Sequence, residues 1–181
     1  MRDTMTDLET LGTVPGCAIL SIGAAAYDDE KVGETFYTPI YLDSCRDAFL
    51  TICPKTQDWW NKQGEDAQKV LTDVLSLETS VTLRMGLEKF NAWITRHCGM
   101  QCRVWGNGSD FDNAILAAAY DAVKLRPAWK FTNNRCYRTV KALAPAIKLE
   151  RVGTYHNAVD DAVSQANHHI AINQHLGIML S

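Results

Sequence analysis

The first 42 residues carry a pattern that predicts strands. Residues 2–9 mix threonines with apolar side chains and precede a loop that contains Gly12 and Gly16. Residues 17–27 are apolar and compatible with a strand, and residues 33–42 are rich in Thr, Tyr, Phe and Ile. Because the polar run at 28–31 is a turn sequence, we predict one strand followed by a hairpin.

After residue 53, apolar residues recur every three or four positions, as they do on one face of a helix. This spacing predicts a short helix from Pro54, which contains Trp59 and Trp60, and further helices at residues 65–74, 81–98, 136–144 and 157–175. The inward face of the 81–98 helix is predicted to consist of Leu83, Leu87, Phe90 and Ile94. The inward face of the last helix is predicted to consist of Val159, Val163, Ala166 and Ile170.

A short strand is predicted at residues 103–105, where a glycine-containing turn separates it from the next helix. Ser109 or Asp110 is the expected cap of that helix, because both side chains accept hydrogen bonds from free backbone N–H groups. One more short strand is predicted near residues 128–132. The order of elements predicts a mixed α/β sheet covered by helices, in a single domain over residues 1–181.

Composition narrows the class of protein. No apolar run reaches about eighteen residues, so no membrane span is expected, and the acidic N-terminus lacks a secretory signal pattern. Cys98 and Cys102 lie beside His97, but no second ligand pair at zinc-site spacing is present. The six cysteines are therefore interpreted as inert thiols in a reducing cytoplasm, the expected location.

Charge is distributed unevenly. The segment from Lys124 to Arg151 holds eight basic residues and one acid, a charge of +7, which leaves −10 for the rest of a chain whose net charge is −3. A basic segment on an acidic body indicates a local contact with phosphate, although a solvated surface stretch is an equal alternative.

Asp7 and Glu9 lie two residues apart in the first predicted strand, so they point to the same face. Two buried acids on one face repel each other and are costly to desolvate, and a hard cation such as Mg²⁺ or Mn²⁺ relieves that cost. The second pair at this spacing, Asp28 and Glu30, lies in a turn where solvent satisfies both acids.

Two further groups of polar residues stand where ligands bind in α/β proteins. Asp110 and Asp112 follow the strand at 103–105; Asp110 suits a helix cap and Asp112 suits a site. Near the C-terminus, His156 is expected just before the last helix and Asp161 in its second turn, while the spacing of Asn157 and Asp160 is typical of a capping box.

Together these patterns resemble the motifs of the DEDDh 3′–5′ exonuclease superfamily, which has a ribonuclease H-like fold. The three stretches that carry the resemblance are residues 7–12, 105–113 and 156–162. A compact phage and bacterial branch is most similar, because it also has an Ile-Gly pair in the second strand, as at Ile22-Gly23, and a Trp-Trp-x-x-Gln element, as at residues 59–63.

The resemblance implies a five-stranded or larger mixed sheet flanked by helices, and a hydrolase that uses two divalent cations, Mg²⁺ or Mn²⁺. It assigns the metal-binding acids to Asp7, Glu9, Asp112 and Asp161, and the general base to His156. Phe111 before Asp112, and the five-residue step from His156 to Asp161, select these acids over Asp110 and Asp160.

The implied substrate is the 3′ end of single-stranded RNA or DNA, from which nucleoside 5′-monophosphates are released. One of the adjacent tryptophans is expected in the core and the other against a base. The residues expected to bind substrate are Thr10, Leu11, Trp60, Gln63 and Arg138. The sequence does not distinguish RNA from DNA as the substrate. A homodimer is one possible oligomeric state.

Three alternatives compete. A catalytically weak or inactive relative that only binds nucleic acid would lack one of the five groups, and none is missing. A nucleotide pyrophosphatase-like enzyme would need another arrangement of acids, commonly ExxE on a helix. In a structural interaction protein, the acids would be caps and surface groups only.

Overall fold

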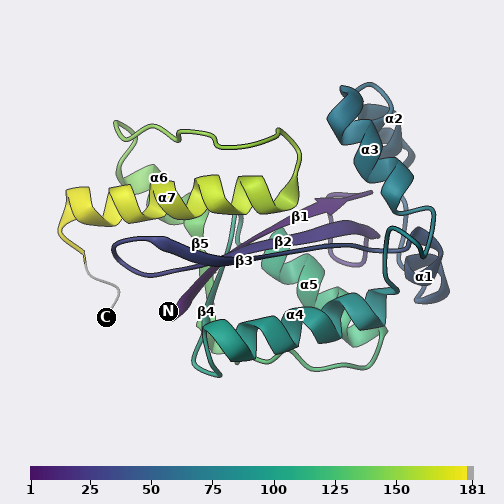
Figure 1. Cartoon of the computed structure of the whole chain (residues 1–181), viewed down its shortest axis with the longest axis horizontal. Coiled ribbons are helices and arrows are strands. Elements are labelled where there is room, and N and C mark those ends of the chain that lie inside the picture. The colour runs from purple at the N-terminus through teal and green to yellow at the C-terminus, as the bar shows by residue number, and fades with distance from the viewer. Residues whose placement is uncertain (179–181) are drawn as a thin grey trace.

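The computed structural model describes residues 1–178, which form a mixed sheet with helices on both faces (Figure 1). The strands are β1 (Asp3–Thr10), β2 (Ile19–Tyr27), β3 (Val32–Pro39), β4 (Arg103–Gly106) and β5 (Asn134–Cys136). The helices are α1 (Leu42–Asp47), α2 (Pro54–Trp60), α3 (Glu65–Asp73), α4 (Leu83–His97), α5 (Asp112–Ala122), α6 (Tyr137–Leu143) and α7 (Ala158–Leu176), with a 3₁₀ turn, η1, at Phe131–Asn133.

The sheet has the order β3-β2-β1-β4-β5, so β1 lies in the middle. It pairs antiparallel with β2, with Asp7 opposite Gly23, and parallel with β4, with Met5 opposite Trp105. Helices α4 and α5 cover one face, α6 and α7 cover the other, and α2 and α3 stand at one end (Figure 1). This is the predicted mixed α/β architecture.

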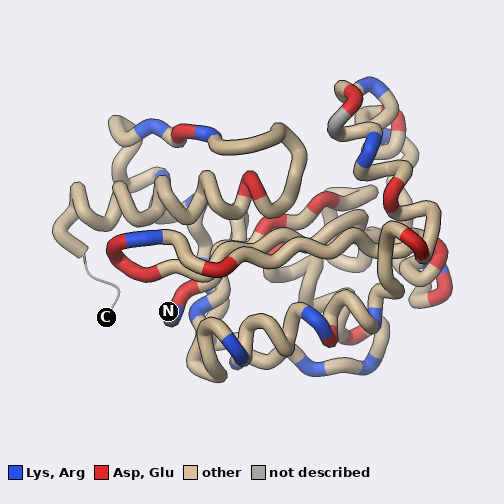
Figure 2. The backbone as a smooth tube through the Cα atoms, viewed as in Figure 1, with Lys and Arg blue, Asp and Glu red and all other residues tan. Residues whose placement is uncertain are grey.

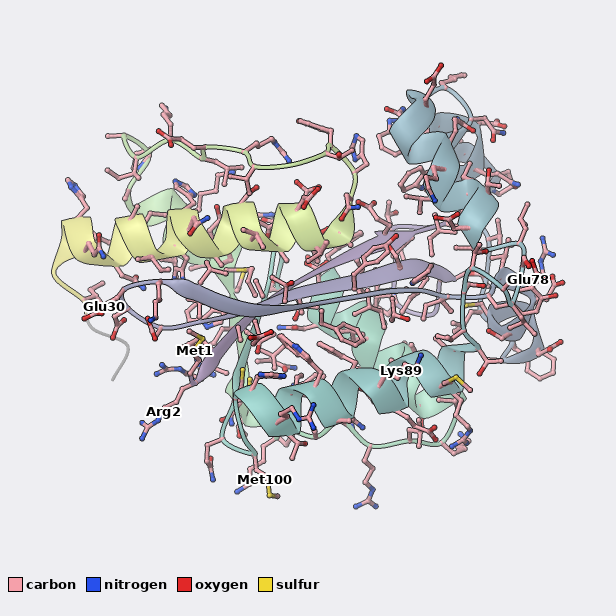
Figure 3. All side chains as sticks on the ribbon, viewed as in Figure 1. Met1, Arg2, Glu30, Glu78, Lys89 and Met100 are labelled. Carbon is pink, nitrogen blue, oxygen red and sulfur yellow. The ribbon has the colours of Figure 1, made fainter. Side chains whose placement is uncertain are left out.

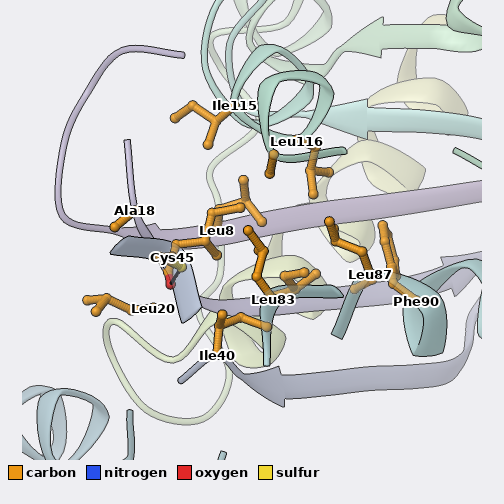
Figure 4. Close-up of a cluster of buried hydrophobic side chains, with 14 of the residues drawn as sticks. Leu8, Ala18, Leu20, Ile40, Cys45, Leu83, Leu87, Phe90, Ile115 and Leu116 are labelled. Carbon is orange, nitrogen blue, oxygen red and sulfur yellow. Dashed lines mark hydrogen bonds between the residues drawn. The ribbon is translucent and has the colours of Figure 1, made fainter. Parts of the chain in front are cut away.

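The main core lies between the sheet and helices α4 and α5 (Figure 4). The predicted inward face of α4 is confirmed, because Leu83, Leu87, Phe90 and Ile94 are all fully buried. Burial of each such side chain stabilises the fold by roughly 1.5–3 kcal/mol. β1 also contributes to the core, since Thr4, Met5 and Thr6 have no exposed surface.

A second cluster anchors α7 and α6 on the opposite face. The Tyr27 hydroxyl lies 2.7 Å from Nδ1 of His169, and the Tyr137 hydroxyl lies 2.5 Å from Nδ1 of His168. Burial, aided by the Arg103 guanidinium, lowers the pKa of His169 to about 4. The ring is therefore neutral near pH 7, which allows it to lie between α7 and the sheet without an unpaired charge.

The buried face of α7 differs from the predicted one. Ala166 and Ile170 are buried as expected, but Val159 and Val163 are only half-buried, while Ala158 and Ala162 are fully buried. The helix is thus rotated by about one residue from the predicted orientation. The reason is close packing, since small side chains face the sheet where the helix approaches it.

Gly23 permits that approach. A Cβ atom on Gly23 would lie 2.1 Å from the carbonyl carbon of Ala158, a distance that real Cβ contacts do not show. The first turn of α7 therefore rests directly on the backbone of β2. This contact fixes where Asp161 lies relative to β1.

The last strand also differs from its predicted position. Residues 128–130 form a loop and Phe131–Asn133 forms η1, so β5 begins six residues later than the predicted strand at 128–132. Trp129 explains the shift, because its ring packs edge-on against Phe90 and Tyr120 in the core. A strand through Trp129 would withdraw that ring. None of the described helices is both long and apolar enough to cross a bilayer.

Replacing Gly23 with alanine is expected to push α7 away from β2 and lower the free energy of unfolding by about 1–3 kcal/mol. Thermal and chemical unfolding measure the change. Gly64→Ala is the matched control, because a Cβ there meets nothing within 4 Å. Equal stability of the two variants would contradict the proposed close packing.

Candidate active site

The acids of β1 meet α7 at one end of the sheet. Asp7 and Glu9 share a face of β1, as their spacing predicts, and a shift in strand register follows Glu9. Ligand atoms of Glu9, His156 and Asp161 all lie within 4.8 Å of one another. Three segments that are far apart in the sequence thus converge on a space that suits a metal ion.

Asp112 belongs to the same group but is held differently. Its carboxylate is buried and accepts hydrogen bonds from the backbone N–H groups of Leu8, at 3.2 Å, and Asn107, at 2.6 Å. It therefore ties the β4–α5 turn to β1. Asp112 also lies close enough to Asp7 and Glu9 to raise the pKa of both carboxyl groups.

The predicted cap of α5 is wrong. The residue that precedes the helix is Phe111, which makes no capping hydrogen bond, and neither Ser109 nor Asp110 caps it. The turn after β4 extends through Asp110, so the helix begins later than predicted and leaves Asp110 exposed. Asp112 in the first helical turn still complements the positive end of the helix dipole.

The loop before α7 positions the histidine. Asn157 caps the helix, as predicted, and accepts hydrogen bonds from the N–H groups of Val159 and Asp160. Asp160 does not complete the capping box, because its carboxylate accepts from the N–H of Thr154 instead. His156 has a φ of +60°, an uncommon backbone conformation for a residue other than glycine, so the loop holds its ring at a backbone cost.

Two groups that sequence reasoning missed also contact the acids. Nε2 of Gln165 donates to Asp7 at 2.7 Å, and the Arg151 guanidinium pairs with Asp161. Gln165 follows Asp161 by four residues, so helical periodicity could have placed it on the same face. Arg151 lies in an irregular loop, where no periodic signal exists.

A cavity of about 630 Å³ opens beside these groups. Three of the four acids line it, Asp7, Glu9 and Asp161. Its other lining residues are Leu8, Thr10, Gly12, Thr13, Cys53, Lys55, Thr56, Trp59, Trp60, Asn107, Phe111, Arg151, Tyr155, His156 and Gln165. Its size suits a small ligand such as a nucleotide. The aromatic side chains supply flat apolar walls.

The two adjacent tryptophans divide as expected, one in the core and one accessible. Trp60 is 1% exposed and donates its indole N–H to the Thr10 carbonyl at 2.9 Å. Trp59 is 44% exposed, and its ring stands edge-on to that of His156 at 5.1 Å between centroids. Trp59 is therefore the more accessible ring, although Trp60, which is among the residues expected to bind substrate, also lines the cavity.

Of the other residues predicted to bind substrate, only some line the cavity. Thr10 lines it, whereas Leu11 is buried in the main core and contributes nothing to the lining. Gln63 lies outside the lining and donates to the Trp59 carbonyl, because it follows Trp59 by four residues. Arg138 also lies outside, where it donates to the carbonyl of Asn107, a residue that does line the cavity.

Burial and mutual repulsion perturb the acids strongly. Burial and the negative charges of Asp112, Glu9 and Asp161 raise the pKa of Asp7 well above its usual range. Burial, followed by repulsion from Asp161 and Asp112, raises the pKa of Glu9 to about 8. The pKa of Asp112 is raised to about 6, chiefly by burial. The site therefore disfavours full ionisation without added positive charge.

The sequence matches a nuclease family and a named nuclease. Residues 2–173 match the model of the 3′-5′ exoribonuclease Rv2179c-like domain. The chain is 26% identical over 164 residues to an exodeoxyribonuclease of Enterobacteria phage T4, an alignment that covers 77% of this chain and 70% of that protein.

Two solved structures show the same fold. The nuclease domain of 3′hExo, a DEDDh family member bound to rAMP, has a TM-score of 0.64 at 13% identity and covers 96% of this chain and 92% of its own. Exonuclease X in complex with 5′ overhanging duplex DNA has a TM-score of 0.54 at 14% identity. The match covers 97% of this chain and 93% of exonuclease X. With its ribonuclease H-like sheet and clustered acids, this chain belongs to the 3′-5′ exoribonuclease Rv2179c-like domain family of DEDDh 3′–5′ exonucleases.

Proposed function

We propose that this protein removes nucleotides one at a time from the 3′ end of single-stranded nucleic acid and releases nucleoside 5′-monophosphates. The observation that carries the proposal is the convergence of Glu9, His156 and Asp161 within 4.8 Å beside a cavity of nucleotide size. Family membership supports the 3′–5′ exonuclease activity itself.

Two divalent cations, Mg²⁺ or Mn²⁺, would be held by Asp7, Glu9, Asp112 and Asp161. The donors fit such ions, because oxygen ligands suit hard cations and the raised pKa values of Asp7 and Glu9 mark a deficit of positive charge. When bound, the cations lower the pKa of a coordinated water and stabilise charge on the phosphate and the leaving oxygen. Asp161 already pairs with one cation, the Arg151 guanidinium.

His156 would act as the general base that takes the proton of the attacking water. Partial burial lowers the pKa of its ring, an effect that Asp161 opposes and Arg151 reinforces. A neutral imidazole at neutral pH is ready to accept a proton. The rings of Trp59 and Tyr155 stand edge-on to the imidazole, at 5.1 and 4.8 Å between centroids, and restrict its orientation.

The aromatic walls favour a single unpaired terminal nucleotide. Trp59 and Tyr155 both line the cavity and are substantially exposed. The Arg151 guanidinium covers one face of the Tyr155 ring, so a base can stack on Trp59 or on the other face of Tyr155. Base stacking contributes about 1–3 kcal/mol per base and requires a base that is free of its complement. This argument favours single strands. The family description names RNA and the phage relative is named for DNA, so both sugars require testing.

The proposal is tested by incubating 5′-labelled single-stranded RNA and DNA with Mg²⁺ or Mn²⁺ and resolving the products as a ladder. Glu9→Gln is expected to slow hydrolysis by about 10³-fold or more, because it removes a charged ligand. Glu30→Gln is the control, since Glu30 occupies the exposed second pair at the same spacing (Figure 3). Binding without hydrolysis by the unmodified protein would support the inactive-relative alternative.

His156→Ala is expected to lower kcat by about 10²–10⁴-fold while KM changes little. The acidic limb of the pH–rate profile, which reports ionisation of the base, should disappear with it. Single-turnover rates measured between pH 5 and 8 distinguish this outcome from misfolding. An unchanged acidic limb would show that another group accepts the proton.

Stability without cations should fall as the pH rises through the site. The pKa of Glu9 is about 8 when folded and near 4.5 when unfolded, and Asp7 is shifted in the same direction. A raised folded pKa gives stability that is present below the unfolded pKa and is lost as pH rises through the folded value. The increase in Tm on adding Mn²⁺ should therefore grow from pH 5 to pH 8, and should shrink in Glu9→Gln. An increase in Tm on adding Mn²⁺ that does not depend on pH would contradict the proposed metal site.

A further inference from the structure

A second hollow runs along α5 and the edge strand β5, which we name the α5–β5 groove. Two adjoining cavities of about 380 and 280 Å³ form it and share Asn113, Ala117 and Asn134. The remaining lining residues are Ser109, Ala114, Arg126, Pro127, Trp129, Lys130, Phe131, Thr132, Arg135 and Cys136. Its basic residues belong to the segment from Lys124 to Arg151, whose charge indicates a local contact with phosphate.

The groove is positively charged on a chain that is otherwise acidic. Its lining includes Arg126, Lys130 and Arg135 and contains neither Asp nor Glu. Arg126 and Lys130 are exposed, and neither pairs with a carboxylate of the described residues. Figure 2 shows blue segments, which mark Lys and Arg, on the loop that follows α5. An anionic occupant is therefore favoured.

The groove also offers an aromatic surface. Phe131 is 84% exposed, beside Lys130. Trp129 is unavailable, because it is nearly buried and its indole N–H donates to Asn134 at 2.8 Å. Cations next to an exposed aromatic ring are the features that bind phosphates and stack bases of single strands. A small inorganic anion has no base to stack on the Phe131 ring, so the ring favours a nucleic acid as the occupant.

One end of the groove lies close to the active-site cavity along the chain. Asn107 lines the cavity, Ser109 lines the groove, and only Gly108 separates them. The Arg138 guanidinium lies at this junction, where it donates to the Asn107 carbonyl at 2.6 Å and would be 3.2 Å from a Cβ on Gly108. A strand whose 3′ end occupies the cavity can thus meet positive charge along its next nucleotides.

We propose that the α5–β5 groove binds the single-stranded nucleic acid on the 5′ side of the nucleotide being removed. The proposal rests on the proposed exonuclease function. It implies that affinity increases with strand length until the groove is filled, whereas hydrolysis of the shortest substrates does not depend on the groove.

The test compares Arg126→Ala/Lys130→Ala with Lys89→Ala/Arg96→Ala, which makes the same charge change at two exposed positions of α4. Figure 3 labels Lys89. Fluorescence anisotropy with EDTA present measures binding of a 12-nucleotide and a 3-nucleotide strand across a salt series. The groove variant should bind the 12-mer about tenfold more weakly. The slope of log K against log salt should fall by about 1.4, because each lost phosphate contact on a single strand contributes about 0.7.

Phe131 provides a second, uncharged probe. Phe131→Ala should weaken binding of the 12-mer by about fivefold or more, and Phe131→Tyr should restore it, because either ring can stack. Cleavage of the 3-mer should keep its kcat in all groove variants. Light scattering of the unmodified protein and Phe131→Ala checks whether a second copy covers the ring.

Three results would contradict the proposed role of the groove. The first is equal affinity of the groove and α4 variants for the 12-mer, and the second is an equal loss of affinity for the 3-mer and the 12-mer. The third is a dimer that Phe131→Ala dissociates. Each leaves the exonuclease proposal intact if the 3-mer is still hydrolysed. Failure of the unmodified protein to hydrolyse any strand would instead reject the exonuclease proposal, while the anisotropy data would still report on the groove.

Discussion

Repulsion among buried carboxylates is the constraint around which this fold is arranged. Asp7, Glu9 and Asp112 gather with Asp161 at one end of the sheet, and removal from water penalises the charged forms of the first three. The protein offsets part of this cost with its own donors. Backbone N–H groups bind Asp112, the Gln165 amide binds Asp7, and a guanidinium pairs with Asp161. What remains is the deficit that cations would fill.

Packing remote from the acids holds them together. α7 carries Asp161 in its first turn, and the same helix is fixed further along by the hydrogen bond between His169 and Tyr27. Across the sheet, Asp3 accepts three hydrogen bonds from the side chains of Arg103 and Trp105, which join β1 to β4. The distance between the acids of β1 and the acid of α7 is thus set by the whole helix–sheet interface.

Periodicity made the helices and strands predictable, while close packing made the rest unpredictable. The spacing of Leu83 and its partners predicted the buried face of α4 correctly. The family resemblance, not periodicity, selected Asp112 and Asp161 as metal-binding candidates, and that assignment stays a prediction. The rotation of α7 depends on contact with Gly23, and the position of β5 depends on where Trp129 packs, neither of which is a local property. Arg151 reaches the site from an irregular loop, so no pattern in the sequence could place it.

The two hydrogen bonds that Asp112 accepts give this residue a structural role in addition to its proposed role as a metal ligand. Leu8 and Asn107 belong to different strands and turns, and each would keep a buried donor without an acceptor if the carboxylate were removed. If Asp112→Ala is inactive, the loss could therefore come either from the missing hydrogen bonds or from the missing metal ligand. Asparagine retains one acceptor oxygen, so the difference between these two substitutions separates the scaffold from the reaction.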